Sequence, residues 1–252
     1  MRIANIPDFP ENAIITQLVT INRRRLFEPM MEEETLKILL RERDRRAEQK
    51  KAQPDIPDED LYVTPEVVFI QAERRVVEMS KLTIFHERAR DAVESGKNVA
   101  IFLNFKASVY ELQKKLKKSF ASFESVVITA DESKDDRKAA LERFQSNEVH
   151  ILIATIGAGG TGVSLHDLHG RPRESIISPP ESAVELKQAL GRIHRAESKS
   201  KAIQYILFAG DTYEETTYER VKNKLQNISA INDGTLSLSD EFQENITPTK
   251  GE

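Results

Sequence analysis

The chain has 252 residues, with 37 lysines and arginines, 41 aspartates and glutamates, and a net charge of -4. That length is enough for one large or two small domains, and a hydrophobic fraction of 39% supports a buried core. The sequence has no cysteine, which excludes disulfides, thiolate chemistry and cysteine-ligated metal sites, while the net charge leaves local basic patches open.

The N-terminal part is predicted to hold one strand and one charged helix. Residues 12–21 are largely apolar, which is typical of a strand or an extended segment. Residues 32–51 carry dense charges of both signs, and this pattern favours a solvated helix over a buried one. Three prolines within 53–66 then indicate a loop or linker.

From residue 65 onward, short apolar runs alternate with helical patterns. The predicted strands cover 99–103, 125–129, 150–154, 175–177 and 202–208. The predicted helices cover 66–95 (as one helix or two), 107–118, 133–145, 181–195 and 212–227. Because alternating strands and helices require right-handed crossovers, we predict an α/β fold with a mainly parallel sheet, helices on both faces and a mostly helical N-terminal extension.

The motif QxxGRxxR is the most specific element of the sequence. On the predicted helix, Gln188, Arg192 and Arg195 are spaced by four and three residues, so they are expected to share one face. Two guanidiniums on one face repel each other, and a bound polyphosphate relieves that repulsion through bidentate hydrogen bonds. The alternative is an ordinary exposed helix whose arginines pair with Glu185 or Glu197.

A glycine-rich loop follows the predicted strand 150–154. Its glycines allow tight turns and close approach, and the exposed N–H groups of such a loop attract anions. Gly157, Gly159 and Gly162 also match GxGxxG, the fingerprint of dinucleotide-binding folds. That fingerprint normally follows the first strand, and the acidic residue expected about 20 positions later could only be Glu181, which opens a helix. A nicotinamide-dependent oxidoreductase is therefore the weaker alternative.

Four blocks, in order, resemble the C-terminal RecA-like lobe of superfamily-two helicases, and most closely the Swi/Snf-like DNA-dependent ATPases. The blocks are residues 99–105 (motif IV), 129–131 with Arg137 and 144–145, 155–165 (motif V) and 188–195 (motif VI). The resemblance covers about 90–210. On this basis we divide the chain into an inter-lobe extended and helical segment (1–64), the RecA-like lobe (65–230) and a polar tail (231–252).

The resemblance implies a role for each residue near ATP, which binds between two such lobes in that family. Arg195 is expected to act as an arginine finger and Arg192 as a second phosphate contact. Gln188 is expected to position the γ-phosphate or the arginines, and Gly160 and Gly162 to line the nucleotide cleft.

The same resemblance implies contacts with a nucleic-acid backbone, and the Swi/Snf-like group favours duplex DNA as the partner. The corresponding positions here are Asn104, Phe105, Lys106, Thr129 and Thr155. Small hydroxyls, backbone amides and a lysine suit phosphate contacts, which position a strand without reading its sequence.

One departure from the family pattern is decisive for activity. The sequence has neither the phosphate-binding GxxxxGK[ST] motif nor an Asp-Glu box after a suitable strand. We therefore expect ATP and Mg²⁺ to be held mainly by an N-terminal RecA-like lobe, on the same or a separate polypeptide. The isolated chain is expected to be inactive.

Other features are weaker. His166 and His169 have a spacing that could suit a metal, but too few ligands lie nearby, and we expect no metal site. The sequence has no signal-peptide pattern and no apolar run near the ~18 residues of a membrane helix, so we expect a soluble, intracellular protein without a membrane partner. A non-catalytic DNA- or protein-binding module that retained the fold remains the main alternative to half of a DNA motor.

Overall fold

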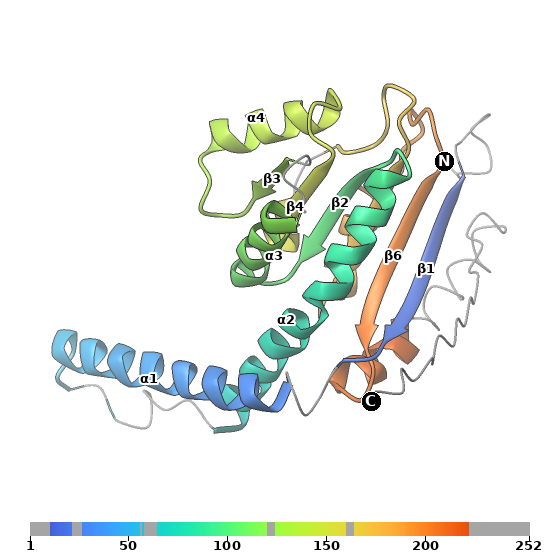
Figure 1. Cartoon of the computed structure of the whole chain (residues 1–252). Coiled ribbons are helices and arrows are strands. Elements are labelled where there is room, and N and C mark those ends of the chain that lie inside the picture. The colour runs from blue at the N-terminus through green and yellow to red at the C-terminus, as the bar shows by residue number, and fades with distance from the viewer. Residues whose placement is uncertain are drawn as a thin grey trace.

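The structure, a computed structural model, describes residues 11–21, 27–55, 57, 65–119, 124–159 and 164–221. Its centre is one six-stranded sheet in which every pairing is parallel, in the order β1-β6-β5-β2-β4-β3 (Figure 1). The strands are β1 (Asn12–Val19), β2 (Asn98–Leu103), β3 (Ser125–Ile128), β4 (Ile151–Thr155), β5 (Arg173–Ile177) and β6 (Ala202–Ala209). The predicted α/β fold with a parallel sheet is confirmed.

The strands read as continuous apolar runs because helices cover both faces of the sheet. All six residues of β2 are buried, and they alternate between two hydrophobic clusters. Ile101 and Leu103 pack into one cluster, whereas Ala100 and Phe102 pack into the other. β1, predicted as a strand from residues 12–21, pairs with β6 at the edge of the same sheet.

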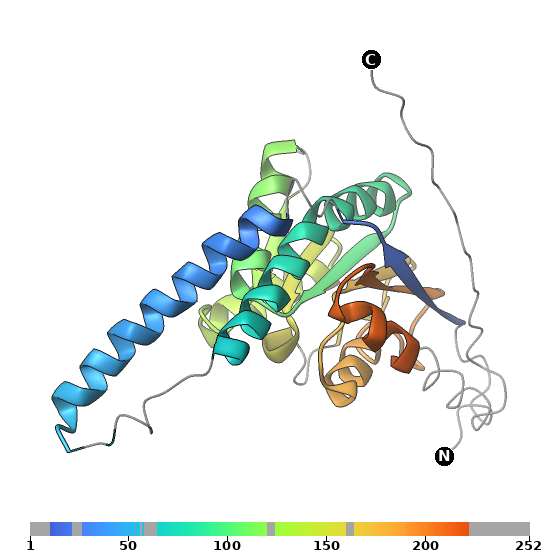
Figure 2. The same ribbon diagram turned by 90° about the horizontal axis from the view of Figure 1, so that it is seen from below.

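The helices form a layer on each side of this sheet (Figures 1 and 2). One face is covered by α2 (Pro65–Glu94) and α3 (Lys106–Ser119). The other is covered by α4 (Lys134–Gln145), α6 (Ala183–Leu190) and the helical residues 213–221, with Tyr218 against the ring of Phe208. Residues 222–252, including the rest of the predicted last helix and the polar tail, lie outside the described residues.

The N-terminal helices extend beyond the sheet. α1 (Glu28–Ala52) projects from the body of the molecule, and its buried side chains Met31 and Ile38 pack with Val68 and Val76 of α2 (Figures 1 and 2). α2 is a single helix of 30 residues. Gly96 follows it with a φ of 79°, a left-handed conformation that glycine adopts without strain. Within the described residues, no helix is long and apolar enough to cross a membrane.

One predicted helix is shorter than expected. The sequence predicts a helix over 181–195, but α6 ends at Leu190 and Gly191 is its C-cap. The chain leaves the helix because the N–H of Leu165 donates to the carbonyl of Arg192, which draws the next residues onto a neighbouring loop. The prediction that Gln188, Arg192 and Arg195 share one helical face is therefore wrong.

Candidate nucleotide and nucleic-acid site

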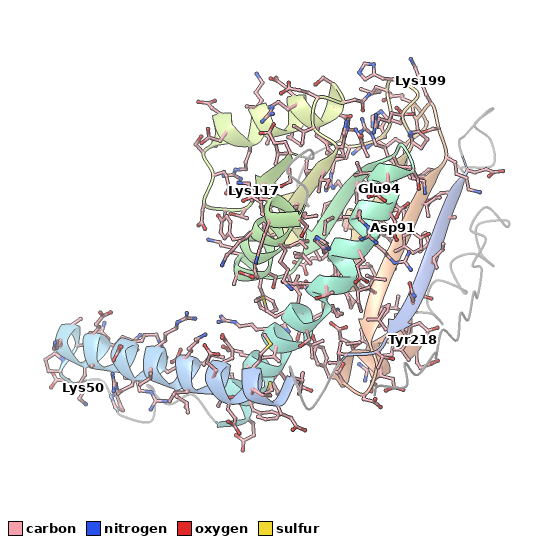
Figure 3. All side chains as sticks on the ribbon, in the orientation of Figure 1. Lys50, Asp91, Glu94, Lys117, Lys199 and Tyr218 are labelled. Carbon is pink, nitrogen blue, oxygen red and sulfur yellow. The ribbon has the colours of Figure 1, made fainter. Side chains whose placement is uncertain are left out.

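The predicted site residues lie at opposite ends of the parallel strands. Asn104 follows the carboxyl end of β2, Thr129 follows β3 and Thr155 ends β4, so these three share the carboxyl edge of the sheet. The segment after α6 returns to the amino edge, where Figure 3 labels Lys199 at the end of the molecule opposite to α1. Arg192 and Arg195 belong to this second region.

At the amino edge, the arginine segment is held by a loop and not by a helix. Residues 164–171 lead from β4 toward β5, and two backbone hydrogen bonds join this loop to the arginine segment. The N–H of Leu165 donates to the carbonyl of Arg192 at 2.9 Å, and the N–H of Lys199 donates to the carbonyl of Asp167 at 3.0 Å. Arg195 lies between these two points, so the loop fixes the path of the chain on both sides of it.

The two arginines differ in exposure. The Arg192 side chain is largely buried, with 8% of the residue exposed, whereas Arg195 and Gln188 are exposed. Burial lowers the pKa of Arg192, and the nearby charge of Arg195 lowers it further, so the two guanidiniums are close enough to repel. Within the described residues, Arg195 has no ion-pair partner. An added anion at this position would relieve the repulsion.

Asp167 organises this loop, and the sequence reasoning did not assign it that role. Its Oδ1 accepts hydrogen bonds from the N–H groups of His169 and Arg171, at 2.9 and 3.0 Å. Burial would raise the pKa of Asp167, but the donors around it and the positive charge of Arg173 hold that pKa below its ordinary value. The signal in the sequence was an aspartate within a predicted loop, because aspartate side chains often accept hydrogen bonds from N–H groups a few residues later, as in an Asx-type turn.

His166, one of the two histidines with a metal-like spacing, contacts residues of its own surroundings. His166 is buried, its Nδ1 lies 2.8 Å from the hydroxyl of Ser164, and its Nε2 lies 3.6 Å from Glu197. Burial lowers the pKa of His166, which favours the neutral ring. Among the described residues, no group of three side chains suited to a metal ion is present.

Arg173 is a further buried cation beneath this region. Its guanidinium lies 4.7 Å from the centre of the Phe144 ring, and its Nη2 is 3.3 Å from the side-chain oxygen of Gln145. Burial lowers the pKa of Arg173 to about 10. The positive charge of Arg173 balances the negative charge of Asp167. This role could not be predicted from the residues next to Arg173 in the sequence, because its partners come from distant segments.

At the carboxyl edge, Glu78 holds the turn between β2 and α3. The backbone N–H groups of Asn104 and Phe105 donate to the two oxygens of Glu78, at 2.8 and 3.0 Å. The Asn104 side-chain amide also donates to Glu78 at 2.8 Å and to the carbonyl of Pro179 at 3.2 Å. The donors of Asn104 are therefore engaged within the protein, and Glu78, on α2, was missed because it lies 26 residues away.

A buried ion pair supports the same turn. The ammonium of Lys81 donates to Glu214 at 2.7 Å and to the hydroxyl of Ser178 at 3.2 Å. The amide of Asn104 lies 3.4 Å from the same hydroxyl. Burial raises the pKa of Glu214, and the charge of Lys81 opposes that effect. This network joins α2, the end of β5 and the last described helix.

The remaining residues of this edge differ in how accessible they are. Thr129 is fully buried, and its hydroxyl accepts from the N–H of Asp131 at 3.1 Å. Lys106 is exposed and pairs with Asp131, a contact that raises the pKa of Lys106 and lowers that of Asp131. Thr155 is mostly buried, next to Leu103 in the sheet. Lys106 is therefore the accessible positive charge among the five residues predicted to contact nucleic acid.

The glycine-rich loop is only partly described. β4 leads into α5 (Ile156–Gly159), a single turn, and a Cβ added at Gly157 would meet no atom within 4 Å. Gly160 and Gly162 lie outside the described residues. The loop follows the fourth strand in chain order, whereas the dinucleotide fingerprint normally follows the first.

Comparison with known proteins finds similarity to helicases over part of the chain. Residues 80–197 match the model of the helicase conserved C-terminal domain. The chain is similar to a protein named putative ATP-dependent RNA helicase L364 of Acanthamoeba polyphaga mimivirus, at 40% identity over 169 residues. That match covers 66% of this chain and 30% of the relative, so the chain spans under a third of the relative's length.

Two solved structures share the fold at low sequence identity. The C-terminal part of the Fun30 ATPase domain matches with a TM-score of 0.56 at 13% identity, covering 84% of this chain and 89% of that one. The Sulfolobus solfataricus SWI2/SNF2 ATPase core, solved in complex with double-stranded DNA, matches with a TM-score of 0.55 at 16% identity. This second match covers 88% of this chain and 47% of that chain.

Proposed function

We propose that this chain, whose residues 80–197 match the model of the helicase conserved C-terminal domain, is the second lobe of an ATP-dependent DNA translocase. In this proposal an N-terminal RecA-like lobe holds most of the ATP and Mg²⁺, and the present lobe closes over the phosphates. The sequence of this chain supports that division because it contains no GxxxxGK[ST] motif.

The observation that carries the proposal is the placement of the two arginines. Arg195 is exposed, has no ion-pair partner within the described residues and lies close enough to Arg192 for their charges to repel. In phosphoryl transfer, catalysis depends on positioning and on cations that stabilise the charge developing on the phosphate oxygens. We assign the arginine finger to Arg195, the second phosphate contact to Arg192 and the positioning of both to Gln188.

Gly160 and Gly162 complete the nucleotide side of the proposal. In the sequence they come after α5 and before the loop that Asp167 organises. Exposed N–H groups in such a loop suit a nucleotide phosphate or ribose. We assign both glycines to the lining of the nucleotide cleft.

We assign the carboxyl edge to the nucleic-acid backbone. Lys106 supplies charge, while Asn104 and Phe105 form a turn that Glu78 keeps rigid, and Thr129 and Thr155 support it from neighbouring strands. The Swi/Snf-like pattern of the motifs favours duplex DNA. The mimivirus relative is named an RNA helicase, so DNA and RNA must be compared directly.

The proposal predicts that Arg195→Ala abolishes nucleic-acid-stimulated ATP hydrolysis by the protein that contains both lobes. Loss of an arginine finger lowers the turnover rate by about 10³-fold or more. The measurement is steady-state ATP hydrolysis with duplex DNA, single-stranded DNA or duplex RNA present in turn. We expect the greatest stimulation by duplex DNA.

Arg90→Ala is the matched control, because Arg90 lies on the surface of α2 and, among the described residues, forms an ion pair with its neighbour Asp91 alone. It should leave hydrolysis unchanged. Retained activity in Arg195→Ala would remove the arginine-finger assignment. Salt-dependent DNA binding without activation by any first lobe would instead favour a non-catalytic binding module.

A further inference from the structure

A groove beside the carboxyl edge has one wall that the proposed function leaves unexplained. It is open, has a volume of about 700 Å³ and lies between α1, α2 and the first turn of α3. Figure 1 shows α1 projecting from the body on the side where α3 lies. The floor is apolar, with Met79 and Phe105, while α1 supplies the outer wall.

The walls of the groove carry more positive than negative charge. Four cations from three helices line the groove, namely Lys37, Arg41, Arg75 and Lys106. Two carboxylates, those of Glu33 and Glu34, line it as well. Three of the four cations take part in ion pairs: Glu33 and Glu34 pair within the lining, and Lys106 pairs with Asp131, which is outside it. Glu33 lies 2.6 Å from Lys37, and Glu34 lies 2.8 Å from Arg75. Arg41 is exposed and has no ion-pair partner within the described residues.

The inner wall is the N-terminus of α3, which carries the partial positive charge of the helix, and Glu78 accepts the N–H groups of Asn104 and Phe105 directly before it. The first turn of this helix holds no acidic residue. Ser108, in that turn, also lines the groove, is fully buried and has a hydroxyl without a hydrogen-bond partner in the described part of the chain. A donor and the end of a helix therefore face the same space as the cations of α1.

The sequence of α1 places its charges on a defined face. Lys37 and Arg41 are four residues apart and lie on the groove side, whereas Met31 and Ile38 pack against α2. With 3.6 residues per turn, Arg43 and Lys50 fall on roughly the opposite side from Lys37 and Arg41. Figure 3 labels Lys50 near the far end of the helix.

We propose that α1 forms the second wall of the nucleic-acid track, so that one strand's phosphodiester backbone passes between α1 and the N-terminus of α3. Lys37 and Arg41 contact phosphates from one side, and Lys106 contacts them from the other. This inference rests on the proposed function and extends it, because it assigns nucleic-acid binding to a helix outside the matched domain, residues 80–197. The occupant is polyanionic because the cations converge from both walls of one groove.

The test is duplex DNA binding by the complete chain, measured by fluorescence anisotropy across a series of salt concentrations. Each phosphate contact contributes about 0.9 to the slope of log affinity against log salt. The double variant Lys37→Gln/Arg41→Gln should reduce that slope by about 1.8 and weaken binding about tenfold or more at low salt. The double variant Arg43→Gln/Lys50→Gln changes the net charge equally on the far face and should leave the slope close to wild type.

The outcomes separate this inference from the proposed function. Equal effects of the two double variants would overturn the assignment of α1, while wild-type binding would still support the DNA partner. If the wild-type chain does not bind DNA, both the assignment of α1 and the DNA partner of the proposed function would be overturned. Unchanged DNA affinity with weaker stimulation of a first lobe would assign the groove to protein contact and also overturn the inference. Thermal unfolding by circular dichroism confirms that each variant is folded.

Discussion

Single buried carboxylates position the two candidate regions. Glu78 accepts from the backbone of Asn104 and Phe105 at one end of the sheet, and Asp167 accepts from two N–H groups at the other. Buried carboxylates remain ionised only where donors or cations compensate them. The sequence pointed to the residues that could contact phosphate, but it did not reveal these supports, because Glu78 acts on a turn far along the chain.

Asp167 allows a prediction about acid stability. Its pKa in the folded state lies below the ordinary value of 3.8, so the ionised carboxylate stabilises the fold fully above that value. The contribution is lost as the pH falls through the folded-state pKa. We predict that Asp167→Asn lowers the free energy of unfolding by about 1–3 kcal/mol at pH 7. The difference from wild type should shrink as the pH approaches 3.

Urea unfolding at pH values between 7 and 3 measures this difference. Asp91→Asn is the control, because Asp91 is exposed and its only ion pair in the described part of the chain is with its neighbour Arg90. A gap between wild type and Asp167→Asn that stays constant across the pH range would contradict the assigned role of the carboxylate charge.

The secondary-structure elements were predictable where local pattern and burial agree. β2 and β4 were identified as apolar runs because parallel strands under two helical layers are buried on both faces. α6 was predicted too long because its apolar spacing continues through Leu186, Ala189 and Ile193, all of which are buried. Its end is decided by Gly191 and by a hydrogen bond to a distant loop, and neither follows from helical periodicity.

The two helix-ending glycines predict opposite effects of substitution by alanine. Gly191 has a φ of -74°, and a Cβ there would lie 3.5 Å from the carbonyl oxygen of Lys187, an ordinary contact. Gly191→Ala should therefore stabilise the chain by about 0.4–1 kcal/mol. Gly96 has a φ of 79°, so Gly96→Ala should destabilise it by about 1–2 kcal/mol. Urea unfolding checks both, and shifts of the same sign would contradict the assigned backbone conformations.

At the scale of the whole molecule, the two regions proposed to bind nucleic acid and nucleotide lie at opposite edges of the parallel sheet. Thr155 ends β4 at the carboxyl edge, beside Leu103 of β2, whereas residues 164–171 hold the arginine segment at the amino edge. The motifs in the sequence predicted both regions. Their positions on opposite edges of the sheet could be found only from the strand order and the backbone contacts of the structure.

The central claim is that this lobe supplies the arginine that completes an ATPase formed with another lobe. The most direct measurement is titration of the chain into a separately produced N-terminal lobe with duplex DNA present, while ATP hydrolysis is followed. Wild-type chain should raise the hydrolysis rate to a plateau, and chain carrying Arg195→Ala should give no rise although it binds DNA equally well. Equal stimulation by both forms would contradict the account.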